Sequence, residues 1–221
     1  MAYRSIINKV LRRLREDTVS ADWIGNLVDS DVDDYQKLIG DFVNEAKQKV
    51  EDAWSWSFLR SLQTVTTSAS TATYAIPLAT NRTTILQVID DSNDFVIPQM
   101  SDADFYNFTF VGTTQNGSPL FYRLNGTDIS FYPTPDAAYT IKIHMVLPQD
   151  DLEEATTTLT VPEHPVVLGA YAFALVERGE DGGTGPGVAS AAFEKSLADF
   201  ISKDTSRTLN ETVWYLSLIH I

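Results

Sequence analysis

The spacing of apolar residues predicts two helices in the first part of the chain. Over residues 3–16, apolar side chains recur at intervals of three and four, and the positions between them are mainly basic. This is typical of a short amphipathic helix with a cationic polar face. A longer stripe with the same spacing runs from Tyr35 to Trp54, and Ser30 or Asp31 is the predicted N-cap of this second helix. Each helix therefore needs a partner that covers its apolar face.

The pattern changes to alternation after Arg60, where threonine, valine, isoleucine and tyrosine become frequent, as in half-buried strands. Asn125 and Gly126 separate two such segments and predict a hairpin with a type I′ turn, which requires positive φ at both residues. A short helical turn is expected to start at Ser101. Strands are predicted at residues 62–67, 72–76, 84–90, 94–98, 120–124, 127–132, 139–147 and 156–161. A compact antiparallel sandwich or barrel is the expected arrangement.

Helical spacing returns after Pro162. The segment from Val166 to Val176 is apolar on nearly every side. It is shorter than the stretch of about 20 residues that crosses a bilayer, so it predicts a central buried helix. A final helix with an apolar stripe from Val188 to Ile201 is expected after a glycine-rich loop. Four helical segments that must bury their stripes against one another indicate a helical bundle.

The predicted fold class is therefore α+β, a four-helix bundle with an inserted antiparallel β-sandwich or barrel domain. We expect residues 1–60 and 162–206 to form the bundle, residues 61–161 the β domain, and residues 207–221 a C-terminal tail. Residues 216–221 differ in character from the rest and match one translation of a common sequencing adapter. We expect them to be an artefact, with the natural C-terminus missing after Tyr215.

An aromatic cluster marks the junction between the second helix and the first strand. Trp54, Trp56 and Phe58 lie within five consecutive residues, and the chain has only four tryptophans. Large aromatic side chains contribute much of the buried area where packed layers meet. These three residues are candidate interdomain anchors, and plain core packing is the alternative.

The charge is strongly acidic and unevenly distributed. Thirty acidic against 16 basic residues give a formal net charge of −14, which opposes binding of DNA or anionic lipid by the bulk surface. Basic residues nevertheless gather near the start, at Arg4, Arg12, Arg13 and Arg15, whereas residues 16–34 contain acids and no base. Such an asymmetry can order identical subunits head to tail, although a solvated face is the alternative.

The residues needed for catalysis or metal binding are sparse. The chain has no cysteine, and its three histidines, His144, His164 and His220, are scattered. The strand-turn-helix motif of serine hydrolases is absent from the sequence. Adjacent carboxylates at Asp90 and Asp91 lie beside a predicted turn, where acids are usually solvated. The sequence therefore predicts no catalytic residue, no cofactor-binding residue and no metal ligand.

Three segments carry a resemblance to a known family. They are the strand-turn-strand sequence of residues 131–141, the aromatic end of the second helix at residues 54–59, and the alanine-rich helix of residues 169–177. Taken together they resemble tailed-bacteriophage head-to-tail adaptor (connector) proteins, a family that includes the podovirus tubular tail protein A.

The resemblance implies a structural protein rather than an enzyme, without cofactors and without a membrane partner. It implies a homo-oligomeric ring, usually of twelve copies, at the head–tail junction of the virion, assembled in the host cytoplasm. The bundle would bind the phage portal protein and the β domain the tail nozzle or tail-tube protein. Arg4, Arg12, Arg13 and Arg15 are then candidates for subunit or portal contacts, and pairing with a neighbour's acidic residues 16–34 is our hypothesis. An acidic lumen would let DNA pass through the channel without specific binding.

Two other function classes remain open on the sequence. The first is a carbohydrate- or peptide-binding module that uses aromatic side chains of the β domain, namely Tyr106, Phe108, Phe110, Phe121, Tyr122 and Tyr132. Exposed aromatic rings would favour it, although such residues are more often buried. The second is a carboxylate-based hydrolase, which would need two acids converging in a cleft.

Overall fold

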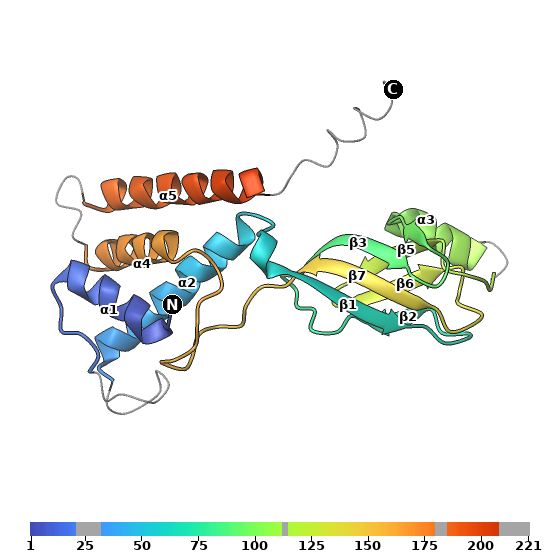
Figure 1. The fold of residues 1–221 in the computed structure, drawn as a ribbon, viewed down its shortest axis with the longest axis horizontal. Helices are drawn as coiled ribbons and strands as arrows, with labels where there is room; N and C mark the ends of the chain where they lie inside the picture. Colours follow the sequence, from blue (N-terminus) through green and yellow to red (C-terminus); the bar gives the residue numbers. More distant parts are fainter. Residues whose placement is uncertain (21–31, 112–114, 180–184, 208–221) are drawn as a thin grey trace, which may run out of the picture. The chain divides into compact units, whose positions relative to one another are not determined.

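The computed structural model describes residues 1–20, 32–111, 115–179 and 185–207, and in these ranges the fold is mixed α+β (Figure 1). The chain divides into two compact units. The helical unit comprises Met1–Phe58 and Gln149–Ile221, and the β unit comprises Leu59–Pro148. The predicted β domain extended to residue 161, but residues 149–161 belong to the helical unit.

The helical unit contains α1 (Tyr3–Leu14), α2 (Asp34–Asp52), α4 (Glu163–Glu177) and α5 (Gly185–Arg207). α4 contacts the other three helices, and most of its side chains are buried (Figure 1). A Cβ atom at Gly169 would lie 3.0 Å from the Cβ atom of Ala46 and 3.2 Å from the ring of Phe193. Glycine at this position therefore lets α2 and α5 pack closely on α4.

The start of α2 differs from the prediction. Asp33 is its N-cap, with the carboxylate accepting from the amide of Tyr35 at 3.3 Å, while Gln36 Oε1 accepts from the amide of Asp33 at 3.2 Å. This reciprocal pair is a capping box. Ser30 and Asp31 are therefore not the caps, and both lie outside the described residues.

The β unit contains two small antiparallel sheets. The first has the order β1 (Arg60–Thr66), β7 (Thr140–Val146), β3 (Thr84–Asp90) and β4 (Phe95–Ile97). The second has the order β2 (Thr73–Ala75), β6 (Asp128–Tyr132) and β5 (Phe121–Asn125). Strand pairing among the described residues does not join them into a closed barrel.

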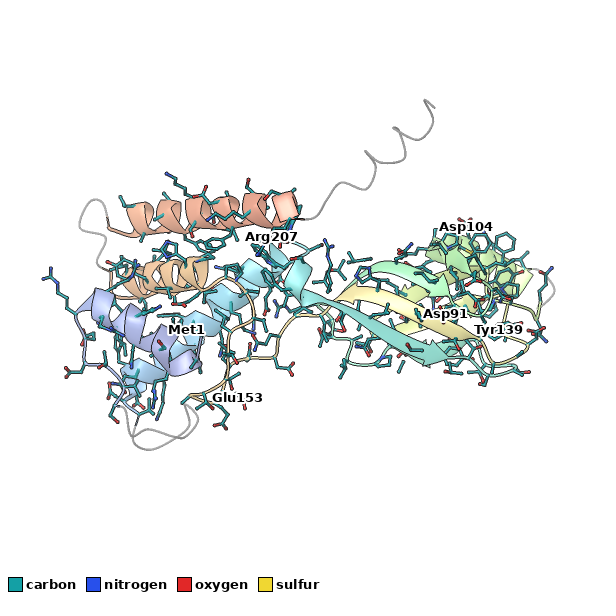
Figure 2. All side chains as sticks on the ribbon, viewed as in Figure 1. Met1, Asp91, Asp104, Tyr139, Glu153 and Arg207 are labelled. Atoms are coloured by element: carbon teal, nitrogen blue, oxygen red, sulfur yellow. The ribbon has the colours of Figure 1, made fainter. Side chains whose placement is uncertain are left out.

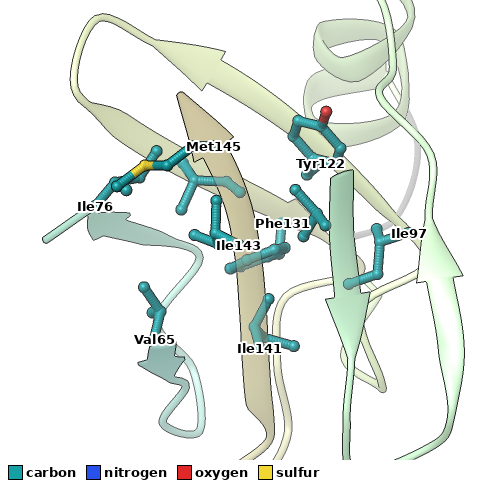
Figure 3. Close-up of a cluster of buried hydrophobic side chains, with 10 residues drawn as sticks. Val65, Ile76, Ile97, Tyr122, Phe131, Ile141, Ile143 and Met145 are labelled. Atoms are coloured by element: carbon teal, nitrogen blue, oxygen red, sulfur yellow. The ribbon is translucent and has the colours of Figure 1, made fainter. Parts of the chain in front are cut away.

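One hydrophobic core is shared by the two sheets (Figure 3). It is built from inward-facing aliphatic and aromatic residues: Val65, Ile76, Val88, Ile97, Tyr122, Ile129, Phe131, Ile141, Ile143 and Met145. On β7, residues 141, 143 and 145 are fully buried while 140, 142 and 144 are only partly buried, as alternation along a half-buried strand requires.

Two sequence predictions for this part of the chain are wrong. The segment 156–161 forms only an isolated bridge between Thr158 and Ala2, not a strand. In the hairpin, Asn125 pairs with Asp128, and Gly126 has φ of +61° while Asn125 does not have a positive φ. Glycine at the first central position with a single positive φ is the pattern of a type II′ turn rather than type I′.

A short helix interrupts the β unit between β4 and β5. It is α3 (Asp102–Tyr106), capped by Ser101, whose hydroxyl accepts from the amide of Asp104 at 3.2 Å. The helix continues as a π-helical segment, η2 (Asn107–Val111), and another short element, η1 (Ser57–Leu59), lies at the boundary of the two units.

No helix in the described ranges is long and apolar enough to cross a membrane. The predicted tail beyond residue 207, including the segment 216–221, lies outside the described residues.

Candidate functional site

A cationic groove lies on the helical unit, where α1, α4 and α5 meet. It consists of three adjoining clefts that all include Phe200 of α5, and we call it the α5 groove. The first cleft, of about 580 Å³, is lined by Lys9, Arg12 and Arg13 from α1 and His164 from α4. Two of the four arginines predicted to make contacts are therefore brought together here.

Basic side chains of α5 extend the groove. Lys195 and Lys203 line the second cleft next to Arg13, and Arg207 lines the third. The ammonium group of Lys203 lies 4.7 Å from the centroid of the Phe200 ring, a cation–π contact over an apolar floor. A floor of this kind with cationic edges suits a partner segment that carries both apolar and acidic side chains.

A buried hydroxyl also faces this region. Ser196 lines the second cleft and is only 7% exposed, and its Oγ atom has no hydrogen-bond partner among the described residues. A buried polar group without a partner costs about 1–3 kcal/mol, which a ligand at the cleft can recover by bonding to it. Acids are present in the groove as well, since Glu163 forms an ion pair with Lys9 and Asp199 lines the second cleft.

Arg4 and Arg15 lie elsewhere on α1. Arg4 is half-buried, and its backbone amide donates to the carbonyl of Ala155 at 3.1 Å. Arg15 is exposed and ends α1 with φ of +60°. Neither is among the described lining residues of the α5 groove, so the structure groups only Arg12 and Arg13. A contact role for any of the four stays a prediction.

The aromatic junction is held by a buried carboxylate that the sequence analysis did not single out. Asp204 of α5 is 3% exposed and accepts three hydrogen bonds. The indole N–H of Trp54 donates at 3.2 Å, the amide of Ser57 at 3.0 Å and the hydroxyl of Ser57 at 2.6 Å. These bonds fix the chain that follows α2 to the C-terminal part of α5.

Trp56 and Phe58 complete the junction. Trp56 is fully buried, and its indole N–H donates to the carbonyl of Val50 at 2.7 Å. Its ring stacks on Phe58 with a centroid distance of 5.4 Å, while Phe58 itself is 42% exposed. The three predicted anchors, Trp54, Trp56 and Phe58, therefore belong to the helical unit, where only Trp56 is fully buried. Their role as interdomain anchors stays a prediction.

A second buried charge braces the start of the segment that returns from the β unit. The ammonium group of Lys47, on α2, donates to the carbonyls of Gln149 at 2.6 Å and Asp150 at 2.9 Å. Glu51 and Asp151 lie within 3.7 Å and 3.6 Å of the same nitrogen. With a fully buried side chain and four oxygen neighbours, Lys47 has a structural role.

The β unit exposes an aromatic patch on α3 and η2, formed by Tyr106, Phe108, Phe110 and Val111. Phe110 is 75% and Val111 83% exposed. The rings of Tyr106 and Phe110 stack with centroids 5.6 Å apart, and Arg123 donates to the hydroxyl of Tyr106 at 2.7 Å. Exposed apolar residues that gather in this way mark interaction surfaces.

The other aromatic residues considered for ligand binding are less accessible. Tyr122 is buried in the core of the β unit, and Phe121 and Tyr132 are half-buried. Burial raises the pKa of the Tyr122 hydroxyl above its usual range. The platform expected from all six residues therefore reduces to the patch on α3 and η2.

The adjacent carboxylates of Asp90 and Asp91 differ in their exposure to solvent. Asp91 is partly exposed and bonds Lys142 at 2.6 Å, but Asp90 is fully buried. Asp90 accepts from the amide of Ser92 at 2.9 Å and from the side-chain amide of Asn93 at 2.7 Å. The prediction that both are solvated is wrong for Asp90, which braces the turn between β3 and β4.

The buried charges that were missed had a signal in the sequence. Asp204 lies four residues after Phe200, and Lys47 lies four residues after Val43, so both fall on the apolar stripes of their helices. A polar residue on such a stripe must be buried with partners or lie where the helix leaves the core. The burial of Asp204 and Lys47 could therefore be predicted from the sequence, whereas their hydrogen-bond partners could not.

A scan against protein-family models matches residues 1–213 to the family described as SU10 adaptor protein. A search of curated protein sequences finds no match. The family match confirms the resemblance, covers both units and accords with a surface built for contacts rather than for catalysis. The chain thus belongs to the SU10 adaptor proteins, a phage head-to-tail adaptor family whose members are structural components of the virion and not enzymes.

Proposed function

We propose that the protein forms a ring beneath the portal vertex of a tailed phage, where it joins head to tail and lines the DNA channel. Twelve copies per ring is the number that the family resemblance implies. The observation that carries the proposal is the family match over residues 1–213. The ring assembles in the host cytoplasm as part of the virion. A ring needs a heterologous interface, in which one surface of each subunit fits a different surface of the next.

The helical unit is the part that binds the portal and neighbouring subunits. The α5 groove supports this assignment, because it gathers basic side chains on a chain of net charge −14. Arg4, Arg12, Arg13 and Arg15 lie on α1, which supplies one wall of the groove, and they are the proposed contact residues of this helix. Trp54, Trp56 and Phe58 fix the conformation of the segment between α2 and β1.

The β unit is the part that binds the tail nozzle or the tail-tube protein. The exposed patch of Tyr106, Phe108, Phe110 and Val111 supports this role, because monomeric proteins rarely expose such a group of apolar side chains without a partner. Phosphate groups of DNA are repelled by the acidic chain, so that the genome passes without specific binding.

Electron microscopy of the protein mixed with portal rings of the same phage tests the proposal. We expect end-on views of a closed ring on one face of the portal. Replacing Arg12, Arg13 and Arg15 together by glutamate should weaken the ring, and unchanged assembly of that variant at physiological salt would count against the role of α1.

The aromatic patch also favours a second candidate function, a carbohydrate- or peptide-binding module. Titration with glycan and peptide libraries distinguishes the two. If the protein does not bind the portal, and if it binds a glycan or peptide specifically but loses this binding in Phe110→Ala, the binding-module function would be supported. Loss of tail-protein binding in the same variant, with portal binding intact, would support the adaptor.

A further inference from the structure

We propose that the α5 groove receives the acidic loop of a second copy of this chain, formed by residues 150–154. The inference rests on the proposed function, since it names the two surfaces that meet between neighbouring subunits of the ring. Both surfaces belong to the helical unit.

The loop is acidic, exposed and fixed in shape. Four of its five residues are Asp150, Asp151, Glu153 and Glu154, and the fifth, Leu152, is buried. Lys47 holds the carbonyl of Asp150, and the carbonyl of Glu154 accepts from the amide of Thr157 at 3.0 Å. The side chains of Glu153 and Glu154 are exposed and form no ion pair with any described residue. Two carboxylates are thus presented on a preformed loop.

The groove offers the complementary charge. Its lining includes six cationic side chains, Lys9, Arg12, Arg13, Lys195, Lys203 and Arg207, against three acids, Glu163, Asp199 and Asp204. The exposed ammonium group of Lys195 forms no ion pair within the described part of the chain. Ser196, the next residue along α5, lines the same cleft, and its hydroxyl, which lacks a partner among the described residues, can donate to a carboxylate. On a protein of net charge −14, acidic segments of another copy are the most abundant complement.

The acidic residues 16–34 fit this role less well. Glu16 pairs with Arg178, and Asp34 pairs with Lys37 at 3.3 Å. Asp33 caps α2. These three carboxylates already have partners in their own chain, which favours loop 150–154 as the occupant of the α5 groove. The pairing of α1 with residues 16–34 of a neighbouring copy stays a separate prediction.

The placement of Arg207 and Glu153 favours a contact between two copies of the chain. Figure 2 shows Arg207, at the end of the groove, and Glu153, in the loop, on opposite sides of the helical unit. A loop on one side that binds a groove on the other generates a head-to-tail chain of subunits, which closes into a ring when the rotation per subunit allows.

A peptide fits the groove better than a nucleic acid does. Glu163 and Asp199 lie among the basic residues and repel a continuous polyanion, whereas a loop with separated carboxylates can avoid them. The half-buried ring of Phe200 gives the floor an apolar character, which phosphate groups do not use.

Cysteine cross-linking tests the contact directly, because the 221-residue sequence contains no cysteine that would compete with the introduced pair. Ala192 lines the second cleft of the groove, and Thr156 follows the acidic loop and is exposed, so Ala192→Cys and Thr156→Cys leave every charge in place. Ala198→Cys, on the exposed side of the same helix, is the matched control. The two variants are mixed with portal rings, oxidised and analysed for intermolecular disulfides.

The expected result is at least about tenfold more heterodimer between Ala192→Cys and Thr156→Cys than between Ala198→Cys and Thr156→Cys. Equal yields, or no link in either mixture, would overturn the inference. A closed ring on the portal without the selective link refutes the inference alone, whereas absence of any ring refutes the proposed function as well.

Charge reversal provides an independent readout. Lys195→Glu with Lys203→Glu should weaken self-association about tenfold, since several favourable ion pairs become repulsive. Combining these changes with Glu153→Lys and Glu154→Lys in the same chain should restore it, while no restoration would contradict the pairing. If the double glutamate variant instead loses affinity for double-stranded DNA and keeps its self-association, the groove binds nucleic acid and the inference is wrong.

Discussion

Replacing Asp204 by alanine tests how firmly the junction after α2 is held. The substitution removes the acceptor of three hydrogen bonds, from the indole of Trp54 and from the amide and hydroxyl of Ser57. A hydrogen bond to a charged group contributes about 1.5–3 kcal/mol, but the three bonds share one side chain and are not additive. We expect Asp204→Ala to lower the free energy of unfolding by about 3–4 kcal/mol.

Urea denaturation followed by far-UV circular dichroism measures this change, because the helical unit supplies most of the helical signal. Asp204→Asn keeps one carbonyl oxygen as an acceptor and should cost about 1–2 kcal/mol. Asp199→Ala is the control, since Asp199 lies on the same helix, is exposed, and should change stability by less than about 0.5 kcal/mol.

A double-mutant cycle separates the network from simple loss of a side chain. Trp54→Phe removes the indole donor, and its effect should shrink when Asp204→Ala is already present, because each change removes the bond between the indole and the carboxylate. If Asp204→Ala costs no more than Asp199→Ala, or if the two effects in the cycle add fully, the carboxylate does not hold the junction and the reasoning is refuted.

Three further predictions concern other buried polar groups. Lys47→Met should lower the free energy of unfolding by about 3–5 kcal/mol in urea, because Glu51 would remain buried without its charge partner; a change under about 1 kcal/mol would contradict this. Burial raises the pKa of the Tyr3 hydroxyl far above its usual range, with Asp41 and Asp151 adding to the shift. In the unfolded chain this hydroxyl has its ordinary pKa of 10.0, so the free energy of unfolding should fall as the pH rises above that value. This fall should be shallower by about 1.4 kcal/mol per pH unit in Tyr3→Phe, and equal slopes would show that Tyr3 is not responsible. Asp90→Ala should lower the melting temperature of the β unit, through a loss of about 2–3 kcal/mol, as followed by near-UV circular dichroism, whereas a variant as stable as the wild type would refute the bracing role.

The sequence predicted the regular elements well because their burial patterns are simple. Residues 84–90 were expected as a strand and form β3 (Thr84–Asp90). The failure at 156–161 has a physical reason. Leu159 and Val161 are buried, and the amide of Leu159 donates to the carbonyl of Met1 at 2.9 Å, so an extended segment packs on helices without joining a sheet. An alternating pattern of apolar residues shows that one face of a segment is buried, but it does not show whether a neighbouring strand pairs with that segment.

The candidate site was predictable only in part. The cationic face of α1 follows from its spacing, so Arg12 and Arg13 could be found. Lys195 and Lys203 belong to the same groove, but this depends on how α5 packs against α1 and α4, which no local pattern contains. The same holds for Asp204, whose partners lie about 150 residues earlier in the chain.

Native mass spectrometry of the protein mixed with portal rings of the same phage is the most direct test of ring formation on the portal. We expect one dominant complex whose added mass corresponds to a complete ring of this chain, and selective loss of that complex in the Lys195→Glu, Lys203→Glu variant. Portal rings that keep their own mass at every concentration of the wild-type protein would show that the chain does not form this ring.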